Sequence, residues 1–483
     1  MLLRLIRKEI LEHLMSLRFA IACVLCVLVV VSSVYVRYQD YSQAMDDYNE
    51  NSIIEKNEIN KISEPWRIVW RGIVVRPRPN PLKIFVRGVE DANGLTVGVN
   101  SWRPLTLATT EKRDVLAPLF PAMDFNFFVG VIMSLMCIVF AYDAICGERE
   151  SGTLRLMLSY PVPRDTVLLG KWIGGYVTLI VPFLLAVISA ATLVLIQSNI
   201  SLAKADWFKL SSICLLSLLY IAAIYSAALW VSCLTRRSST SVIILVTLWM
   251  IIVLAIPNLS PYLAQKWRPT RSPVEVEKTR RESVDDIWQR LSEDRMDAYD
   301  KEHGFDDPWY KGLNRMIWEQ NQRAIRRYIY RAEVEHETCR AVLREHGKID
   351  ESISVGLDSQ IRLCRWISRI SPFATFAIAT TELTDTGLVR KRRFLDQLRE
   401  YQLELCDYGF AAMLEIRKYE LEHEGKSMDW KGEREKPIPL FSYVPPATAD
   451  YLKAIVVDAG LLAGVAMLFF LLCYLAFLRY DVR

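Results

Sequence analysis

Gly170-Lys171 is the dipeptide that comes nearest to a nucleotide-binding motif. A phosphate-binding loop needs the spacing G-x-x-x-x-G-K-[ST], because backbone N–H groups and the lysine surround the phosphates while the hydroxyl holds magnesium. Asp165 stands where the first glycine should be, and Trp172 stands where the hydroxyl should be. The sequence therefore predicts that this chain does not hydrolyse ATP.

The histidines and serines do not have the spacing of catalytic groups either. His336-Glu337 has no second histidine at position 340, as a helical zinc-hydrolase motif requires. No G-x-S-x-G nucleophile elbow occurs in the sequence. We therefore expect no enzyme activity, no catalytic residue, no metal site and no cofactor in this chain.

The ten cysteines divide between apolar and charged parts of the sequence. Most lie in or beside apolar stretches, where small polarizable side chains pack well. Only Cys339, Cys364 and Cys406 lie elsewhere, and their spacing matches no metal motif. Three cysteines cannot all pair within one chain, so we expect at most one disulfide there, with free buried thiols as the alternative.

Six stretches of 18 to 32 residues contain no Asp, Glu, Lys or Arg. As helices they would be roughly 27 to 48 Å long, enough to cross a hydrocarbon core about 30 Å thick. With 52% hydrophobic residues, this pattern excludes a soluble globular enzyme and a disordered chain. We predict an α-helical polytopic membrane protein whose transmembrane helices are residues 19–36, 125–142, 172–203, 210–235, 238–265 and 459–478.

Basic residues in the short connections predict the orientation. Segments 1–18, 143–171, 236–237 and 479–483 together carry twelve lysines and arginines, against two in segment 204–209. Because basic residues favour the cytoplasmic side, we expect both termini in the cytoplasm and the chain in the cytoplasmic membrane. The net charge is only +4 and the positive residues sit at membrane edges, so we expect no nucleic-acid partner.

Two large segments are then extracytoplasmic, residues 37–124 and 266–458. The first begins as a continuation of the first membrane helix. From Trp66 to Arg87 it becomes basic and rich in strand-forming residues, which predicts a small mixed α/β domain. Its basic face could meet lipid phosphates or an anionic cargo, or could simply be solvated.

The second extracytoplasmic segment predicts a large domain of long helices. Ser272-Pro273 begins one helix and Gly304 ends it. Asp307-Pro308 begins a second, which we expect to end at Gly347, and a third runs from about 390 to 424 before Gly425. The uncharged run 370–381 is too short to span a bilayer, and we expect it to pack in this bundle or to touch the membrane interface.

A known family is suggested by segment 143–171. It contains G-E-R-E-S-G-T-L at 147–154, L-S-Y-P-V-P-R at 158–164 and L-L-G-K at 168–171. These three linked elements resemble the cytoplasmic segment of ABC-2 type transporter permeases. The resemblance implies six membrane helices, a homo- or heterodimer with a second permease subunit, and a separate cytoplasmic ABC ATPase that binds ATP and Mg²⁺.

The same resemblance implies that residues 148–164 form a short coupling helix that contacts the ATPase. Charged residues would offer hydrogen bonds to that partner and leucines would offer apolar anchors, whereas the alternative is a solvated loop. The predicted contact residues are Glu148, Arg149, Glu150, Ser151, Gly152, Thr153, Leu154, Arg155, Leu158, Pro161 and Arg164.

Residues 1–18 resemble the amphipathic connecting helix of that family. Leu3, Ile6, Ile10 and Leu14 fall on one face of a helix, as a helix lying in the lipid interface requires. Simple anchoring without contact to the ATPase is the alternative.

Two functions fit the pattern. The first is the membrane subunit of an ATP-driven exporter. The second is a mechanical transmission subunit that acts on an extracytoplasmic protein partner without moving a solute. The large extracytoplasmic insertions depart from compact members of the family, so neither the cargo nor such a partner follows from the resemblance.

Overall fold

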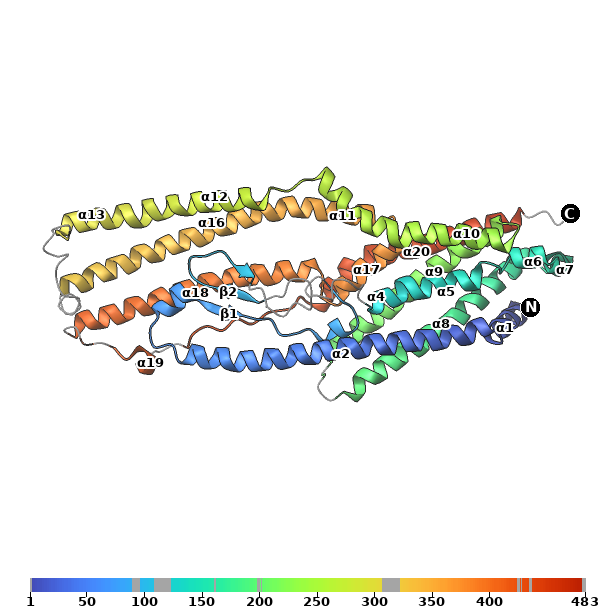
Figure 1. Ribbon diagram of the computed structural model, residues 1–483, viewed down its shortest axis with the longest axis horizontal. Coiled ribbons are helices and arrows are strands. Elements are labelled where there is room, and N and C mark those ends of the chain that lie inside the picture. The colour runs from blue at the N-terminus through green and yellow to red at the C-terminus, as the bar shows by residue number, and fades with distance from the viewer. Residues whose placement is uncertain are drawn as a thin grey trace.

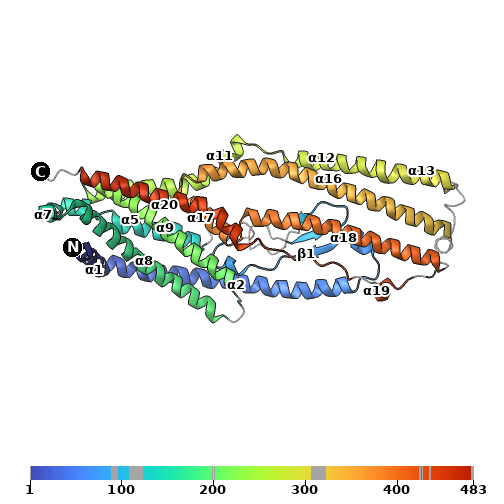
Figure 2. The ribbon, with the colours of Figure 1, turned by 180° about the vertical axis from the view of Figure 1, so that it is seen from behind.

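The computed structural model of the chain is elongated, with a helical bundle at one end and long helices at the other (Figure 1). The bundle contains the apolar helices, and the long helices at the other end are rich in charged residues. We call these ends the membrane half and the distal half. The N-terminal helix and the end of the C-terminal helix lie together at the tip of the membrane half (Figures 1 and 2). The structure describes residues 2–88, 96–107, 123–159, 162–197, 200, 202–305, 322–423, 426, 428–433 and 437–479.

Six helical stretches are long and apolar enough to cross a membrane, which confirms the predicted number. They are Leu17–Asn60, Phe125–Glu150, Arg164–Ile196, Lys204–Leu234, Ser238–Trp267 and Ile455–Leu478. The elements of the membrane half are α1 (Leu2–Leu14), α2 (Leu17–Asn60), α4 (Phe125–Phe127), η4 (Phe128–Met133), α5 (Ser134–Ala141), α6 (Cys146–Glu150), α7 (Thr153–Ser159), α8 (Arg164–Ile196), α9 (Lys204–Leu234), α10 (Ser238–Trp249), η5 (Met250–Ala255), α11 (Ile256–Trp267) and α20 (Thr448–Leu478).

α9 lies at the centre of the membrane half and packs against α5, α17 and α20. Tyr220 and Tyr225 of this helix are fully buried. η4 and η5 are π-helical turns inside otherwise α-helical spans. Pro257 follows η5 directly, and because proline lacks an N–H group it removes one hydrogen bond from the preceding turn. The irregularity in this span therefore has a local chemical cause.

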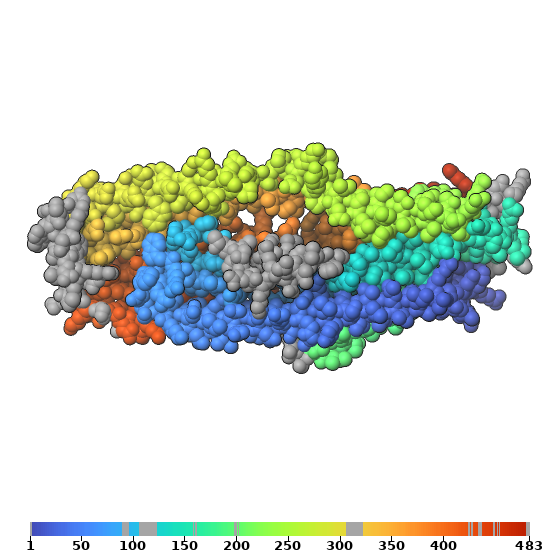
Figure 3. Space-filling view, in the orientation of Figure 1, coloured from blue at the N-terminus to red at the C-terminus, as the bar shows by residue number. Residues whose placement is uncertain are grey.

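α2 continues without a break from the membrane half into the distal half, as the sequence predicts. Its 44 residues give a length of about 66 Å, roughly twice the thickness of a hydrocarbon core. Figure 3 shows the helix along one edge of the molecule. One continuous helix therefore links the membrane half to the distal half.

Long helices form most of the distal half: α12 (Pro273–Trp288), η6 (Gln289–Glu293), α13 (Asp294–His303), α16 (Gln322–Ser368), α18 (Leu388–Glu422) and the short α19 (Trp430–Glu433). The Ser272 side chain accepts a hydrogen bond from the N–H of Val274 and caps α12. Gly304 ends α13 in the left-handed conformation, with φ of 71°. Both predicted boundaries are therefore confirmed.

The predicted helix end at Gly347 is wrong. α16 continues through Gly347 to Ser368, because its packing against α12 and α18 outweighs the small cost of a glycine in a helix. The predicted start at Asp307-Pro308 and the predicted stop at Gly425 lie outside the described residues.

A small antiparallel sheet covers α18 within the distal half. It consists of β1 (Ile73–Val75), β2 (Val97–Val99) and β3 (Thr106–Leu107), in the order β1-β2-β3. Ile73 pairs with Val99, and Val97 pairs with Leu107. Two short helical turns flank β1, namely η1 (Arg67–Arg71) and η2 (Pro81–Ile84). The inward valines pack against Phe394 and Leu398 of α18, which gives this part of the chain the mixed α/β character expected from the sequence.

The uncharged run near residue 370 forms α17 (Pro372–Leu383), which packs on the membrane helices α9 and α20. Phe376 stacks on Tyr220 of α9 with 5.2 Å between ring centroids. The Thr380 hydroxyl donates to Asn126 Oδ1 at 2.7 Å. α17 therefore lies at the junction of the two halves. Of its two predicted positions, this favours the membrane interface over the distal bundle.

His346 of α16 provides a test of the distal packing. Its Nδ1 lies 3.2 Å from Arg280 Nη1, and its Nε2 lies 3.3 Å from the carbonyl oxygen of Trp102. Burial, followed by the nearby Arg280 charge, lowers the pKa of His346 below its ordinary value of 6.5, against smaller opposing effects of the Trp102 carbonyl, Asp350 and Glu277. The neutral ring is thus the form that the fold favours.

We predict that the stability contributed by His346 is complete above pH 6.5 and declines as the pH falls below that value, because the unfolded chain then binds a proton that the folded chain resists. His346→Gln should therefore make the unfolding midpoint less sensitive to pH between 7.5 and 5.5, measured in detergent by intrinsic fluorescence. The exposed His423→Gln is the matched control. An equal pH sensitivity in wild type and His346→Gln would contradict the assignment.

Candidate functional site

The predicted coupling segment folds as two short helices at the tip of the membrane half (Figure 1). α6 and α7 are joined through Gly152, whose φ of 77° is the left-handed conformation that favours glycine. Ser232 of α9 holds the start of α6, because its hydroxyl accepts hydrogen bonds from the N–H groups of Ile145 and Cys146, both at 3.2 Å. The segment is thus fixed to a membrane helix at its first residue.

Glu148 reaches inward from α6 to a buried lysine. Lys171 Nζ of α8 lies 2.8 Å from Glu148 Oε1 and 3.1 Å from Glu9 Oε1 of α1. The lysine side chain is only 4% exposed. One ammonium group therefore joins α1, α6 and α8, and we call these three residues the Lys171 cluster.

The other two charged residues of the motif bind the connection between α9 and α10. Arg149 Nη1 lies 3.4 Å from the carbonyl oxygen of Thr235. The Glu150 carboxylate accepts from the N–H of Ser238 at 3.1 Å and from its hydroxyl at 2.9 Å, so it caps the first turn of α10 and suits the helix dipole. Glu148, Arg149 and Glu150 thus all have contacts within this chain.

The residues of the coupling segment that remain exposed form a separate surface. Leu156 is 64% exposed, whereas Leu154 is buried against the membrane core. We define the tip surface as the exposed residues Ser151, Gly152, Thr153, Arg155, Leu156 and Ser159. Glu150 beside them is also exposed but is held by Ser238. Pro161 and the side chain of Leu158 lie outside the described part of the structure. Arg164 turns away from this surface and donates to the carbonyl oxygen of Leu478 at 2.8 Å.

α1 packs closely on α8 through two glycines. A Cβ atom at Gly174 would lie 2.7 Å from Glu9 Cβ, and one at Gly170 would lie 3.1 Å from Leu5 Cβ. Any larger side chain at Gly174 would push α1 away and separate Glu9 from Lys171. The two glycines and the Lys171 cluster thus both hold α1 against α8.

The predicted apolar face of α1 is exposed at its two ends and partly buried in its middle. Leu3 is 81% exposed and Leu14 is also exposed, while Ile6 and Ile10 are partly buried. An apolar face of this kind suits the lipid interface. Burial lowers the pKa of His13, whose ring meets Phe140 edge-on with 5.5 Å between ring centroids.

A cavity of about 1130 Å³ separates α1 from the coupling segment. Its wall includes Leu5, Glu12, Arg18, Glu148 and Met157, so it offers charges of both signs and apolar surface. Glu148 Oε2 is buried and makes no hydrogen bond within the described part of the chain. This oxygen remains an acceptor for a donor that enters the cavity.

Sequence reasoning missed the partners that hold the segment in place. Glu9, Asp143 and Ser238 were not among the predicted site residues, and Lys171 was noted only as part of a motif. Arg18 Nη1 at the start of α2 lies 2.9 Å from Asp143 Oδ2. A weak signal was present, since Asp143 and Lys171 are among the charged residues that directly border uncharged membrane stretches, where an unpaired charge is costly.

We predict that Lys171→Met lowers the free energy of unfolding by about 3–5 kcal/mol, because it leaves two carboxylates buried without their counter-ion. Adding Glu9→Gln and Glu148→Gln to the same chain should recover most of this loss. The measurement is thermal unfolding in detergent. Lys8→Met on the exposed side of α1, where the lysine meets Glu12 at 3.9 Å, is the control and should change stability by no more than about 0.5 kcal/mol. A Lys171→Met chain as stable as this control would contradict the role of the cluster.

A known protein family matches almost the whole chain, and individual relatives match shorter parts of it. The model of the family described as ABC-2 family transporter protein matches residues 3–482. A probable ABC transporter permease protein NosY of Pseudomonas aeruginosa is 38% identical over 100 residues, which cover 20% of this chain and 36% of that protein. A protein of the same description from Stutzerimonas stutzeri is 39% identical over 77 residues, which cover 16% of this chain and 28% of that protein. The matched region thus spans about a third of each relative.

Proposed function

Because the chain belongs to the ABC-2 family of transporter proteins, we propose that it is the permease subunit through which a separate cytoplasmic ATPase drives export of a substrate across the cytoplasmic membrane. The ATPase would bind ATP and Mg²⁺. The observation that carries the proposal is the Lys171 cluster, which joins the coupling segment to α1 and α8. A force applied to residues 148–164 would therefore reach the membrane helices.

The proposed orientation places the tip of the membrane half in the cytoplasm. α1, α6, α7 and the end of α20 all lie at this tip (Figure 2). The basic residues of the short connections lie in the same segments, as the preference of lysine and arginine for the cytoplasmic side requires. The distal half would then be extracytoplasmic.

The proposed docking site consists of the tip surface and the neighbouring cavity. Leu156 supplies an exposed apolar side chain and Arg155 a charge, the combination that protein interfaces use for anchoring and orientation. The cavity beside α1 adds Glu148 Oε2 as a buried acceptor. An element of the ATPase that enters this cavity would touch α1 and the coupling segment together.

α2 of this chain has a surface that would suit contact with a second permease subunit. Val24, Val27, Leu28 and Val31 line an almost wholly apolar groove of about 740 Å³, with Leu193 of α8 at its edge. Two copies that packed together through these grooves would bring their α2 helices side by side, and both helices would then border one transport path. We propose this face for the permease dimer, with lipid covering the remaining exposed apolar residues.

We predict that Arg155→Glu combined with Leu156→Ser uncouples the transporter without unfolding it. Both side chains are exposed, and exposed substitutions usually change stability by within about 0.5 kcal/mol. The double variant should reach the membrane and keep its unfolding midpoint, but should lose at least tenfold in co-purified ATPase and in permease-stimulated ATP hydrolysis. Lys278→Glu on exposed α12 of the distal half is the control. Unchanged co-purification would refute the docking site.

A mechanical output is the second candidate, and the continuity of α2 favours it. The helix is anchored at its start by Arg18 to Asp143 and contacts the distal sheet region through the ion pair of Glu55 with Arg76 at 2.8 Å. Motion at the coupling segment would therefore move the distal half as a lever. Such a machine would act on an extracytoplasmic protein and would carry no solute.

We predict that a three-glycine insertion after Ser42 in α2 separates the two outputs. The insertion breaks the lever because glycine disfavours the helix, yet it leaves the Lys171 cluster intact. An exporter should keep accumulating cargo in inverted vesicles that contain this chain and its ATPase. A mechanical subunit should keep ATP hydrolysis but lose the nucleotide-dependent change in distance between spin labels in the distal half. Accumulation of any cargo would contradict the purely mechanical function.

A further inference from the structure

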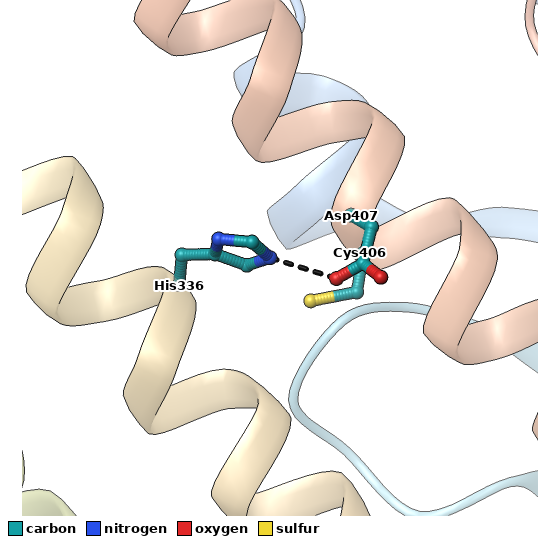
Figure 4. Close-up of side chains that lie close together, drawn as sticks. All are labelled: His336, Cys406 and Asp407. Carbon is teal, nitrogen blue, oxygen red and sulfur yellow. Dashed lines mark hydrogen bonds and ion pairs between the residues drawn. The ribbon is translucent and has the colours of Figure 1, made fainter.

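His336, Cys406 and Asp407 meet between the two longest helices of the distal half (Figure 4). His336 lies on α16, and the other two residues lie on α18. Their imidazole nitrogen, thiol sulfur and carboxylate oxygen are all within 4.8 Å of one another. We propose that these three side chains bind a divalent cation of borderline softness, with Zn²⁺ as its representative, and that the ion clips α16 to α18.

The donor set defines the class of ion. Imidazole nitrogen, thiolate sulfur and carboxylate oxygen are the three donor types found in zinc sites. Hard cations such as Mg²⁺ and Ca²⁺ instead prefer oxygen ligands alone. A mixed nitrogen, sulfur and oxygen set therefore favours a borderline transition-metal ion.

The present distances are close to those that an ion would impose. Bonds of about 2.0–2.3 Å in a tetrahedral site place neighbouring donors about 3.5 Å apart. His336 Nε2 and Asp407 Oδ1 are now 2.8 Å apart and share a hydrogen bond, which the ion would replace. The His336 ring stacks on Phe410, with 5.1 Å between centroids and 26° between planes, so its orientation is already fixed. Since the three donor atoms all lie within 4.8 Å of one another, side-chain movements of roughly 1 Å would bring them to this spacing.

The surroundings leave one side of the site open. Cys406 is fully buried beside Cys339, Leu343 and Phe410. The side chains of His336 and Asp407 are 24% and 45% exposed. The apolar floor shields the sulfur, and the exposed side provides a path for the ion and room for a water molecule as fourth ligand. Zinc accepts this number of ligands, because three protein ligands with a water molecule in the fourth position are the arrangement of catalytic zinc sites.

Arg340 gives the proposal a distinctive test. Its Nε lies 3.6 Å from Asp407 Oδ1, one helical turn after His336. The guanidinium group helps to orient the carboxylate, but its positive charge opposes a nearby divalent cation. Neutralising Arg340 should therefore strengthen ion binding. A merely structural bond between His336 and Asp407 predicts no ion binding at all.

The experiment uses the full-length chain in detergent, stripped with EDTA and titrated with Zn²⁺ against a chromophoric chelator. We expect one ion per chain, at least tenfold weaker binding in His336→Ala and Asp407→Asn, and several-fold tighter binding in Arg340→Gln. In a separate titration with Co²⁺ alone, wild type should show thiolate-to-metal charge-transfer absorption, and Cys406→Ser should lose it.

Two matched variants control for surface binding and for misfolding. His423→Gln, at the C-cap of the helix that carries Cys406, and Cys364→Ser, on the same helix as His336, should bind Zn²⁺ as wild type does. Zn²⁺ should also raise the unfolding midpoint of wild type and of Arg340→Gln, because an ion that binds the folded chain stabilises it. This measurement still tests the proposal if a ligand variant fails to fold. The site is refuted if wild type shows no saturable Zn²⁺ binding, if Cys406→Ser keeps the Co²⁺ absorption, or if Arg340→Gln binds no more tightly than wild type.

Discussion

A buried ammonium group between two carboxylates is the constraint on which the tip of this molecule depends. Lys171 lies under α1 and α6, with Glu9 on one side and Glu148 on the other. Moving three charges out of water is costly, and only close, well-directed contacts compensate for it. The three helices therefore have little freedom to slide past one another, since any displacement that lengthens one contact leaves a charge buried and unpaired.

This rigidity determines how motion can pass through the chain. α1 is fixed to α8 by the cluster and by the close approach at Gly174, whereas α2 begins after a break at Ser16, whose side chain caps it. Arg18 then ties the first turn of α2 back to Asp143 beside α6. Contacts at and beside the coupling segment thus hold both α1 and the first turn of α2. Because α2 runs on into the distal half, the same contacts set the position of the distal half as well.

Features that depend on local sequence were predictable, and features that depend on distant pairs were not. Uncharged stretches predicted the six membrane helices, and Ser272 and Gly304 marked helix ends because caps act within one turn. The helix end predicted at Gly347 is wrong because a glycine is only a local signal, whereas the packing of α16 on α18 decides the conformation there. The partners Glu9 and Lys171 are 162 positions apart, and His336 and Asp407 are 71 apart. No spacing rule within one helix can find such pairs.

The charged motif of the coupling segment has a structural role within this chain, beside the ATPase contact that the family resemblance predicts. Glu148, Arg149 and Glu150 contact Lys171, Thr235 and Ser238 of this chain, so their charges hold the segment against three membrane helices. If the proposed ATPase docks on the tip surface, its recognition would fall to Arg155, Leu156 and the cavity beside α1. Support and recognition would then reside in different residues, because a docking surface transmits force only when the structure behind it does not yield. Glu148, Arg149 and Glu150 would provide that support through their contacts within the chain.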